Sequence, residues 1–204
     1  SDMDLFDNNP DLFKDKPLAE RLRPNSLEEF FGQDHLIGTG KPIRQMIDKK
    51  SIVSMILWGP PGVGKTTLAL IISRLLEYDF IQLSAVSSGV KDVREAINKA
   101  EKNQKFYNKK TILFIDEIHR FNKSQQDSLL HSVEQGLLTL IGATTENPSF
   151  EVISPLLSRC RVFTLEELGK RDFESIVERA LKYDMVLKDF DIKIIDINFL
   201  ISLS

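Results

Sequence analysis

A glycine-rich loop between an apolar run and a helical pattern constrains the fold of this chain more than any other feature. The loop fits the pattern G-x-x-x-x-G-K-[ST], which is typical of a phosphate-binding turn. Before it lies the continuous apolar run Met55–Trp58, typical of a buried parallel strand, and after it apolar residues recur at helical spacing over 66–76. This strand–loop–helix order favours a nucleotide-binding α/β fold over a chance match. The loop consists of Gly59, Pro60, Pro61, Gly62, Val63, Gly64, Lys65 and Thr66.

The residue types in this loop suit the binding of ATP and Mg²⁺. Glycines let backbone N–H groups face phosphate oxygens, because no Cβ blocks the approach. A helix that begins near Lys65 directs its positive end toward the same phosphates. We expect Lys65 to contact the β- and γ-phosphates and the Thr66 hydroxyl to bind Mg²⁺. The predicted nucleotide-binding segment runs from Gly59 to Thr67.

Strand and helix patterns alternate along the middle of the chain. Apolar runs predict five strands, at residues 55–58, 80–83, 111–115, 137–142 and 161–165. Helical spacing predicts helices at residues 66–76, 90–106 and 123–134. The alternation predicts a three-layer α/β fold with a parallel five-stranded sheet.

The two ends of the chain differ in composition from its middle. Residues 1–17 are polar and acidic and are expected to form a flexible arm, whereas residues 18–168 form the ATP-binding domain. From residue 169 to residue 204 only helical patterns occur, which predicts part of a helical lid. Because the sequence stops within an apolar helical pattern, we expect it to be a fragment of a longer protein.

Two carboxylates follow the predicted strand at residues 111–115. Asp116 is expected at the carboxyl edge of the sheet, where ligands bind in open α/β folds, and to hold Mg²⁺. Glu117 is placed to orient and deprotonate the attacking water. An acidic turn that merely ends a strand is the alternative, and its pairing with the phosphate-binding loop makes that alternative weak.

Three further residues are candidates for the catalytic site. Thr144 and Thr145 follow a predicted strand, and one hydroxyl is expected to contact the γ-phosphate or the attacking water; Thr145 is favoured. The alternative is that both threonines cap the next turn. Arg159 is a candidate arginine finger, a residue that stabilises charge on the transferred phosphoryl group. By sequence alone, a surface arginine is an equally good interpretation.

Composition limits the other classes of function. The chain has 204 residues, a net charge of −3 and a pI of about 5.7, so contact with nucleic acid requires a local basic patch. One such stretch spans residues 102–110, although a solvated helix end is the favoured interpretation. The single cysteine and the lack of a signal peptide or an apolar run of ~18 residues predict a cytoplasmic protein with no membrane partner.

Several stretches together resemble the AAA+ ATPases, in particular the clamp-loader branch and the replication-associated recombination protein A family. The resemblance covers roughly residues 17–170. It rests on the segments PLAERLRP, GQDHLIG, SMILWGPPGVGKTT, LSAVSSGVKD, FIDEIHRFNKSQQDSLLHSVEQG, LIGATTENPSFEV and LLSRCRVF. Clamp-loader subunits share the SRC segment at 158–160 and the RP-GQ box, but not the ENPSFE segment.

The resemblance implies a DNA-dependent ATPase that acts at stalled or damaged replication forks and associates with the nucleoid. It implies contact with single-stranded gaps, ends or forks, a homo-oligomer in the full-length protein, and Arg159 acting on ATP of a neighbouring subunit. A single-strand-binding protein and a sliding clamp are possible partners; two short Asp-Leu-Phe segments resemble clamp-docking peptides. The alternatives are a clamp-loader subunit and a nucleotide-binding switch that scarcely hydrolyses ATP.

Overall fold

The computed structural model describes residues 33–167. The predicted N-terminal arm at 1–17, residues 18–32 of the predicted ATP-binding domain and the predicted lid at 169–204 lie outside the described residues. Within residues 33–167, no helix is both long enough and apolar enough to cross a membrane.

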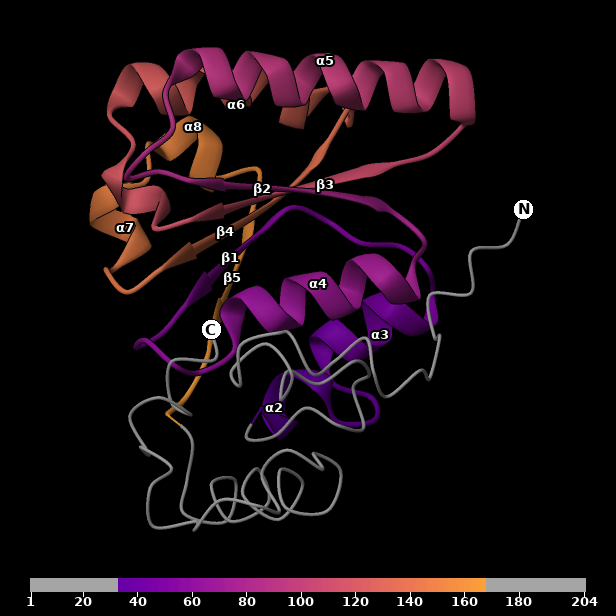
Figure 1. The fold of residues 1–204 in the computed structure, drawn as a ribbon. Coiled ribbons are helices and arrows are strands. Elements are labelled where there is room, and N and C mark those ends of the chain that lie inside the picture. Colours follow the sequence, from indigo (N-terminus) through magenta and orange to yellow (C-terminus); the bar gives the residue numbers. More distant parts are fainter. Residues whose placement is uncertain (1–32, 168–204) are drawn as a thin grey trace, which may run out of the picture.

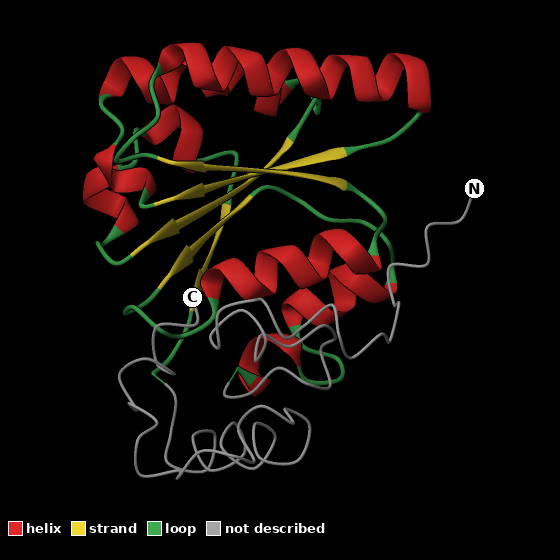
Figure 2. Cartoon of the chain, in the orientation of Figure 1, coloured by secondary structure: helices red, strands yellow, loops and turns green. Residues whose placement is uncertain are grey.

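A five-stranded, all-parallel sheet forms the centre of the molecule (Figure 2). Its spatial order is β2-β3-β4-β1-β5. The strands are β1 (Met55–Trp58), β2 (Asp79–Ser84), β3 (Thr111–Asp116), β4 (Thr139–Thr144) and β5 (Arg161–Thr164). The predicted α/β fold with five parallel strands is confirmed.

Strand β4 lies two residues later than the sequence pattern predicts. Gly136 adopts a positive φ of 68° at the end of the preceding helix, and the Leu137 N–H still bonds back to the Ser132 carbonyl at 3.0 Å. The strand therefore begins at Thr139 and extends to Thr144, which pairs in register with Trp58. Because of this shift, Thr144 belongs to the sheet and not to the loop that follows.

Helices cover both faces of the sheet (Figure 1). Helices α2 (Asp34–Ile37), α3 (Pro42–Asp48) and α4 (Lys65–Leu75) lie on one side. On the other lie α5 (Val90–Tyr107), α6 (Lys123–Glu134), α7 (Pro148–Glu151) and α8 (Ser154–Leu157), with the 3₁₀ helix η2 (Ile118–Arg120) after β3. This arrangement gives the three layers expected from alternating strands and helices.

Local sequence explains where the helices begin. At α6, the Asn122 side chain accepts from the Gln125 N–H at 2.9 Å, and the Gln125 side chain accepts from the Asn122 N–H at 2.9 Å. This reciprocal pair is a capping box. At α5, the Asp92 carboxylate accepts from the Gly89 N–H at 2.8 Å.

The core has two parts, one on each face of the sheet. Strand β3 contributes to both, since successive residues point to opposite faces: Phe114 packs against the side of α4, and Leu113 and Ile115 pack against the side of α5 and α6. All three are fully buried, and burial of each such side chain stabilises the fold by about 1.5–3 kcal/mol. A strand buried on both faces provides a rigid support for the residues that follow its carboxyl end.

Candidate functional site

The loop between β1 and α4 has the backbone geometry of a phosphate-binding loop. Gly62 and Gly64 have φ values of 79° and 89°, a region that residues with a Cβ rarely adopt. The Gly59 N–H donates to the Thr144 carbonyl at 3.1 Å, which fixes the start of the loop to the end of β4. Helix α4 begins at Lys65, so its N-terminal N–H groups face the loop. These features suit the binding of a phosphate chain.

Lys65 is held inside this loop. Its Nζ donates to the carbonyl oxygens of Gly59 at 2.6 Å and Pro60 at 2.9 Å. Burial lowers the pKa of Lys65, while the nearby carboxylates of Asp116 and Glu117 act to raise it. An ammonium has three N–H donors, so these two bonds leave one for a phosphate oxygen. A phosphate would also supply the negative charge that a buried ammonium requires.

Asp116 is the last residue of β3 and Glu117 follows it, at the same end of the sheet as the phosphate-binding loop. The pKa of Asp116 is raised, chiefly by burial and then by repulsion from Glu117; Lys65 and His119 act to lower it. Ser84 pairs with Asp116 in the sheet, and the Ala85 N–H donates to the Asp116 carbonyl at 2.9 Å. A carboxylate that is partly desolvated beside another carboxylate is stabilised by a bound cation.

Glu117 adopts a left-handed backbone conformation, with φ 53° and ψ 47°. Such a conformation is uncommon for a residue with a side chain and is often found at functional sites. Its carbonyl accepts from the Arg120 N–H at 2.8 Å, which begins η2. The strained residue therefore turns the chain sharply away from the sheet directly after Asp116.

The oxygen donors at this edge suit Mg²⁺ bound together with phosphates. A hydroxyl from Thr66 and a carboxylate from Asp116 are the hard oxygen ligands that Mg²⁺ prefers. Across residues 33–167, no group of three or more His, Cys, Asp or Glu side chains lies together as a metal site. Mg²⁺ commonly needs only one or two protein ligands when substrate phosphates supply the others. The donor set thus fits the cation predicted from the sequence.

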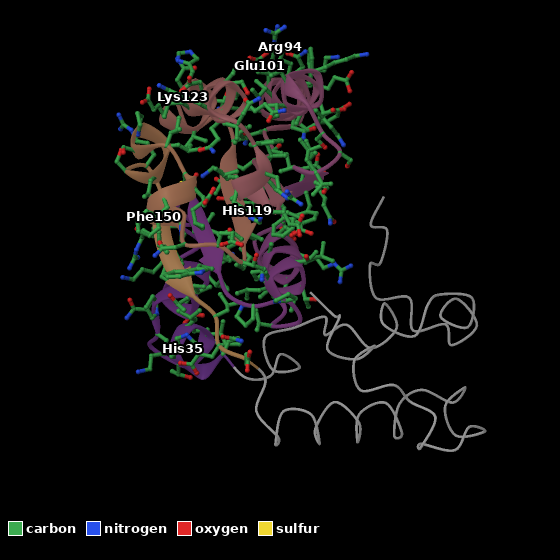
Figure 3. All side chains as sticks on the ribbon, turned by 90° about the vertical axis from the view of Figure 1, so that its left-hand side faces the viewer. His35, Arg94, Glu101, His119, Lys123 and Phe150 are labelled. Atoms are coloured by element: carbon green, nitrogen blue, oxygen red, sulfur yellow. The ribbon has the colours of Figure 1, made fainter. Side chains whose placement is uncertain are left out.

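The two threonines at the carboxyl end of β4 have different environments. Thr144 is 1% exposed, and its Oγ1 accepts from the Glu146 N–H at 2.9 Å and lies 3.0 Å from Nδ1 of His119. Thr145, the next residue, is exposed at the carboxyl edge. Figure 3 looks onto this edge and places His119 near its middle. The Thr144 hydroxyl therefore joins β4 to η2, and this favours Thr145 as the residue that faces the phosphates.

Arg159 lies at the amino ends of the strands, opposite the carboxyl ends where the phosphate-binding loop and the two carboxylates lie. Two residues later, Arg161 pairs in register with Met55, the first residue of β1, and donates its N–H to the Ser54 carbonyl at 3.0 Å. The phosphate-binding loop leaves the other end of the same strand. Arg159 itself is 54% exposed and forms an ion pair with Glu134, at 3.3 Å between Nη2 and Oε1. The structure therefore does not bring Arg159 to the loop of its own chain.

Gln33 supports the loop and was not predicted as a site residue. Its side chain is fully buried, donating from Nε2 to the Glu166 carbonyl at 2.9 Å and toward the Val63 carbonyl at 3.4 Å. Its Oε1 accepts from the Glu166 N–H at 3.1 Å. Gln33 thus connects the loop with the segment after β5. The only sequence signal was its place in the GQDHLIG segment.

The family model of the ATPase family associated with various cellular activities (AAA) matches residues 55–168. The match spans the phosphate-binding loop, both carboxylates and the whole sheet. The chain belongs to the AAA family. The resemblance found in the sequence is confirmed at this level.

This AAA domain is similar to several curated proteins. Replication-associated recombination protein A of Haemophilus influenzae is 54% identical over 166 residues, which cover 81% of this chain and 37% of the relative. The protein of the same name from Escherichia coli is 53% identical over 167 residues, covering 82% and 37%. The ATPase WRNIP1 of Dictyostelium discoideum is 50% identical over 173 residues, covering 85% and 20%. The chain therefore spans little more than a third of the length of the bacterial relatives.

The AAA domain also resembles solved structures of RuvB from Thermotoga maritima, described as a Holliday junction branch migration motor. The two share 32% sequence identity with a TM-score of 0.65, over 78% of this chain and 54% of RuvB. A similarity at this level supports the assignment of the AAA fold.

Proposed function

We propose that this chain binds ATP with Mg²⁺ and hydrolyses it to ADP and phosphate, within a longer protein that acts on DNA at stalled or damaged replication forks. The supporting observation is that the buried Lys65 and the carboxylates of Asp116 and Glu117 share one edge of the sheet and influence one another's charge. The DNA context is supported by relatives named for replication-associated recombination and by the branch-migration motor.

The proposed roles follow from the geometry. Residues 59–67 surround the phosphates, and Lys65 neutralises charge on the β- and γ-phosphates. Thr66 and Asp116 would hold Mg²⁺, which would supply positive charge against the charge that develops on the phosphates. Glu117 orients the attacking water and accepts its proton. All these residues lie at or directly after the carboxyl ends of β1 and β3.

Two proposed residues act around this centre. Thr145 contacts the γ-phosphate or the water, as its exposed place beside the buried Thr144 suggests. Arg159 acts on the ATP of a neighbouring subunit, because it lies at the edge of the sheet opposite its own loop. The proposed reaction site is therefore completed by an oligomer of the full-length protein.

The test compares ATP binding and ATP turnover in the full-length protein, with and without gapped or forked DNA. Glu117→Gln should bind ATP with normal affinity and lose about 100-fold or more of its turnover, since general-base catalysis contributes typically 10²–10⁴-fold. Lys65→Ala should lose tight binding, because the phosphates lose their counter-charge. Normal turnover by Glu117→Gln would contradict the role of Glu117 as base.

The DNA in the same assay tests the biological context. Faster turnover with gapped or forked DNA alone is the expected result. Faster turnover only after a sliding clamp is added would instead support a clamp-loader subunit. Tight ATP binding without turnover under any of these conditions would support a nucleotide-binding switch.

A further inference from the structure

The carboxyl-terminal end of α5 extends past the sheet that the rest of the helix covers. At ~1.5 Å per residue the 18-residue helix is ~27 Å long, whereas the six residues of β2 or β3 span only ~20 Å. Near this end, Asn103 Nδ2 donates to Asp79 Oδ2 at 2.7 Å and to Thr111 Oγ1 at 3.0 Å. Asp79 and Thr111 are the first residues of β2 and β3, so the helix leaves the sheet after Asn103 (Figure 1).

Two large aromatic side chains lie on this projecting end. Phe106 is 66% exposed and Tyr107 is 74% exposed. Tyr107 follows Ala100 by seven residues and Ala96 by eleven, so it belongs to the face that α5 packs against the sheet. It stays exposed because the sheet has ended. A single exposed apolar residue is ordinary, but two adjacent rings on a polar helix end have no packing role within residues 33–167.

Lysines are frequent in the sequence on both sides of the two rings. Residues 99–110 contain five lysines against one glutamate, a net charge of +4 in a chain whose net charge is −3. Lys99 lies 3.7 Å from Asp79, and Lys105 Nζ lies 5.4 Å from the Phe106 ring centroid. A lysine in the last turn of a helix stabilises the helix dipole, which explains Lys105 but not the others. Lys102, Lys105, Lys109 and Lys110 are all exposed; Lys110 Nζ also lies 5.8 Å from the ring centroid of Tyr78.

We propose that this surface, the α5-end patch, binds single-stranded DNA. The patch is defined as Lys102, Lys105, Phe106, Tyr107, Lys109 and Lys110. Exposed aromatic rings stack on unpaired bases whatever the sequence, and lysines beside them neutralise the phosphates. The bases of a duplex are already stacked on each other, so the rings favour single strands. The proposal rests on the proposed action on DNA, and adds where the strand is held.

The patch lies beside the amino ends of β2 and β3, whereas the phosphate-binding loop follows the carboxyl end of β1. Arg159 lies at the same amino ends of the sheet. Asn103 marks this edge through its bonds to the first residues of β2 and β3. A strand bound there does not contact ATP in the same chain. Changes in the patch should therefore alter DNA affinity and leave ATP affinity unchanged.

The test measures binding of fluorescent oligodeoxythymidylate of about 20 nucleotides, which exceeds the ~4–16 nucleotides of typical single-strand sites. The probe is titrated with the full-length protein and with a Phe106→Ala/Tyr107→Ala variant. Loss of two stacking rings should weaken binding about tenfold or more. Phe150→Ala is the matched control, because Phe150, labelled in Figure 3, is 84% exposed but belongs to α7 and not to the end of α5.

Salt dependence tests the lysines separately. In Lys109→Ala/Lys110→Ala, the slope of log affinity against log salt should become shallower by about 1.4, or ~0.7 for each phosphate of a single strand that a lysine no longer neutralises. ATP affinity, measured on each variant, should match the wild type. Both substituted pairs are exposed, so the variants are expected to fold normally.

Several results would overturn the proposal. One is unchanged oligonucleotide affinity in Phe106→Ala/Tyr107→Ala, and another is an equal loss of affinity in Phe150→Ala. A smaller oligomer on sedimentation of the patch variants would show that the patch contacts a second copy instead. Wild-type protein that turns over ATP but binds no oligonucleotide would also contradict it, whereas failure of ATP turnover would contradict the proposed function.

Discussion

Replacing Gly59 with alanine tests how closely the phosphate-binding loop packs against the chain after β5. The new Cβ would lie 2.6 Å from the Leu165 carbonyl oxygen and 3.2 Å from the Leu165 Cβ. Ordinary van der Waals contact begins at 3.4 Å, so the two backbone segments must separate by about 0.8 Å. The Leu165 N–H donates to the Trp58 carbonyl at 2.7 Å, and the same movement strains that bond.

The expected loss of stability follows from two opposing effects. Forcing an extra methyl into a packed site destabilises by about 1–3 kcal/mol. Alanine also restricts the unfolded chain, which stabilises by about 0.4–1 kcal/mol. The net loss is therefore about 1–2 kcal/mol, which lowers Tm by roughly 2–8 °C for a chain of this size. ATP affinity should fall as well, because Gly59 begins the loop.

The measurement is thermal and urea unfolding of wild type and Gly59→Ala, with nucleotide affinity measured in parallel. Gly89→Ala is the matched control, since a Cβ there meets nothing within 4 Å and its φ is −121°. In Gly89→Ala, a weaker helix cap and a restricted unfolded chain nearly cancel, so its stability should stay within about 1 kcal/mol of wild type. Equal Tm values for Gly59→Ala and Gly89→Ala, with unchanged ATP affinity, would refute the packing argument.

Three further predictions address charge, support and assembly. Asp116→Asn should stabilise the fold at neutral pH, because burial raises the Asp116 pKa and disfavours the charged carboxylate. The native state then binds the proton more tightly than the unfolded state, so wild-type stability falls as pH rises from about 3.8 through the raised pKa of Asp116. The stability gained by Asp116→Asn should therefore vanish in unfolding curves measured below pH 3.8. ATP turnover should be lost in the same variant. Gln33→Leu should destabilise by about 1–3 kcal/mol, since it removes both hydrogen bonds between the buried Gln33 side chain and the partly buried backbone of Glu166, and urea unfolding measures this. Arg159→Ala should leave stability within about 1 kcal/mol of wild type, because the ion pair of Arg159 is largely exposed. ATP affinity should be unchanged, whereas turnover in the full-length oligomer should be abolished. A loss of ATP affinity in the 204-residue chain would show that Arg159 acts in its own subunit.

The local elements of the site were predictable because their signals are short-range. The glycine pattern with its Lys65, the apolar strand that ends in Asp116, and the helix after the loop each depend on neighbouring residues. The boundary of β4 was less predictable. Leu137 and Leu138 are apolar and look like strand residues, but Gly136 and the closing turn of α6 delay the strand until Thr139.

The choice between Thr144 and Thr145 shows what the tertiary structure added. Both are threonines after an apolar run, and the sequence favoured Thr145 without showing how their environments differ. The sheet register carries β4 through Thr144, whose hydroxyl then meets the Glu146 N–H and His119. Thr145 stays exposed at the edge. Only contacts between distant parts of the chain distinguish the two.

The sequence by itself determined the fold class, the glycine-rich loop before α4 and the two carboxylates at the end of β3, because residue type and spacing dictate local conformation. Three features were decided by the tertiary structure alone. The Gln33 side chain connects the loop to Glu166, which lies 133 residues after Gln33 in the sequence. Arg159 lies at the amino ends of the strands, opposite its own loop, and α5 carries Phe106 and Tyr107 beyond the sheet. Each depends on the order, register and length of strands that are far apart in the chain, and pairing between such strands is a property of the assembled sheet.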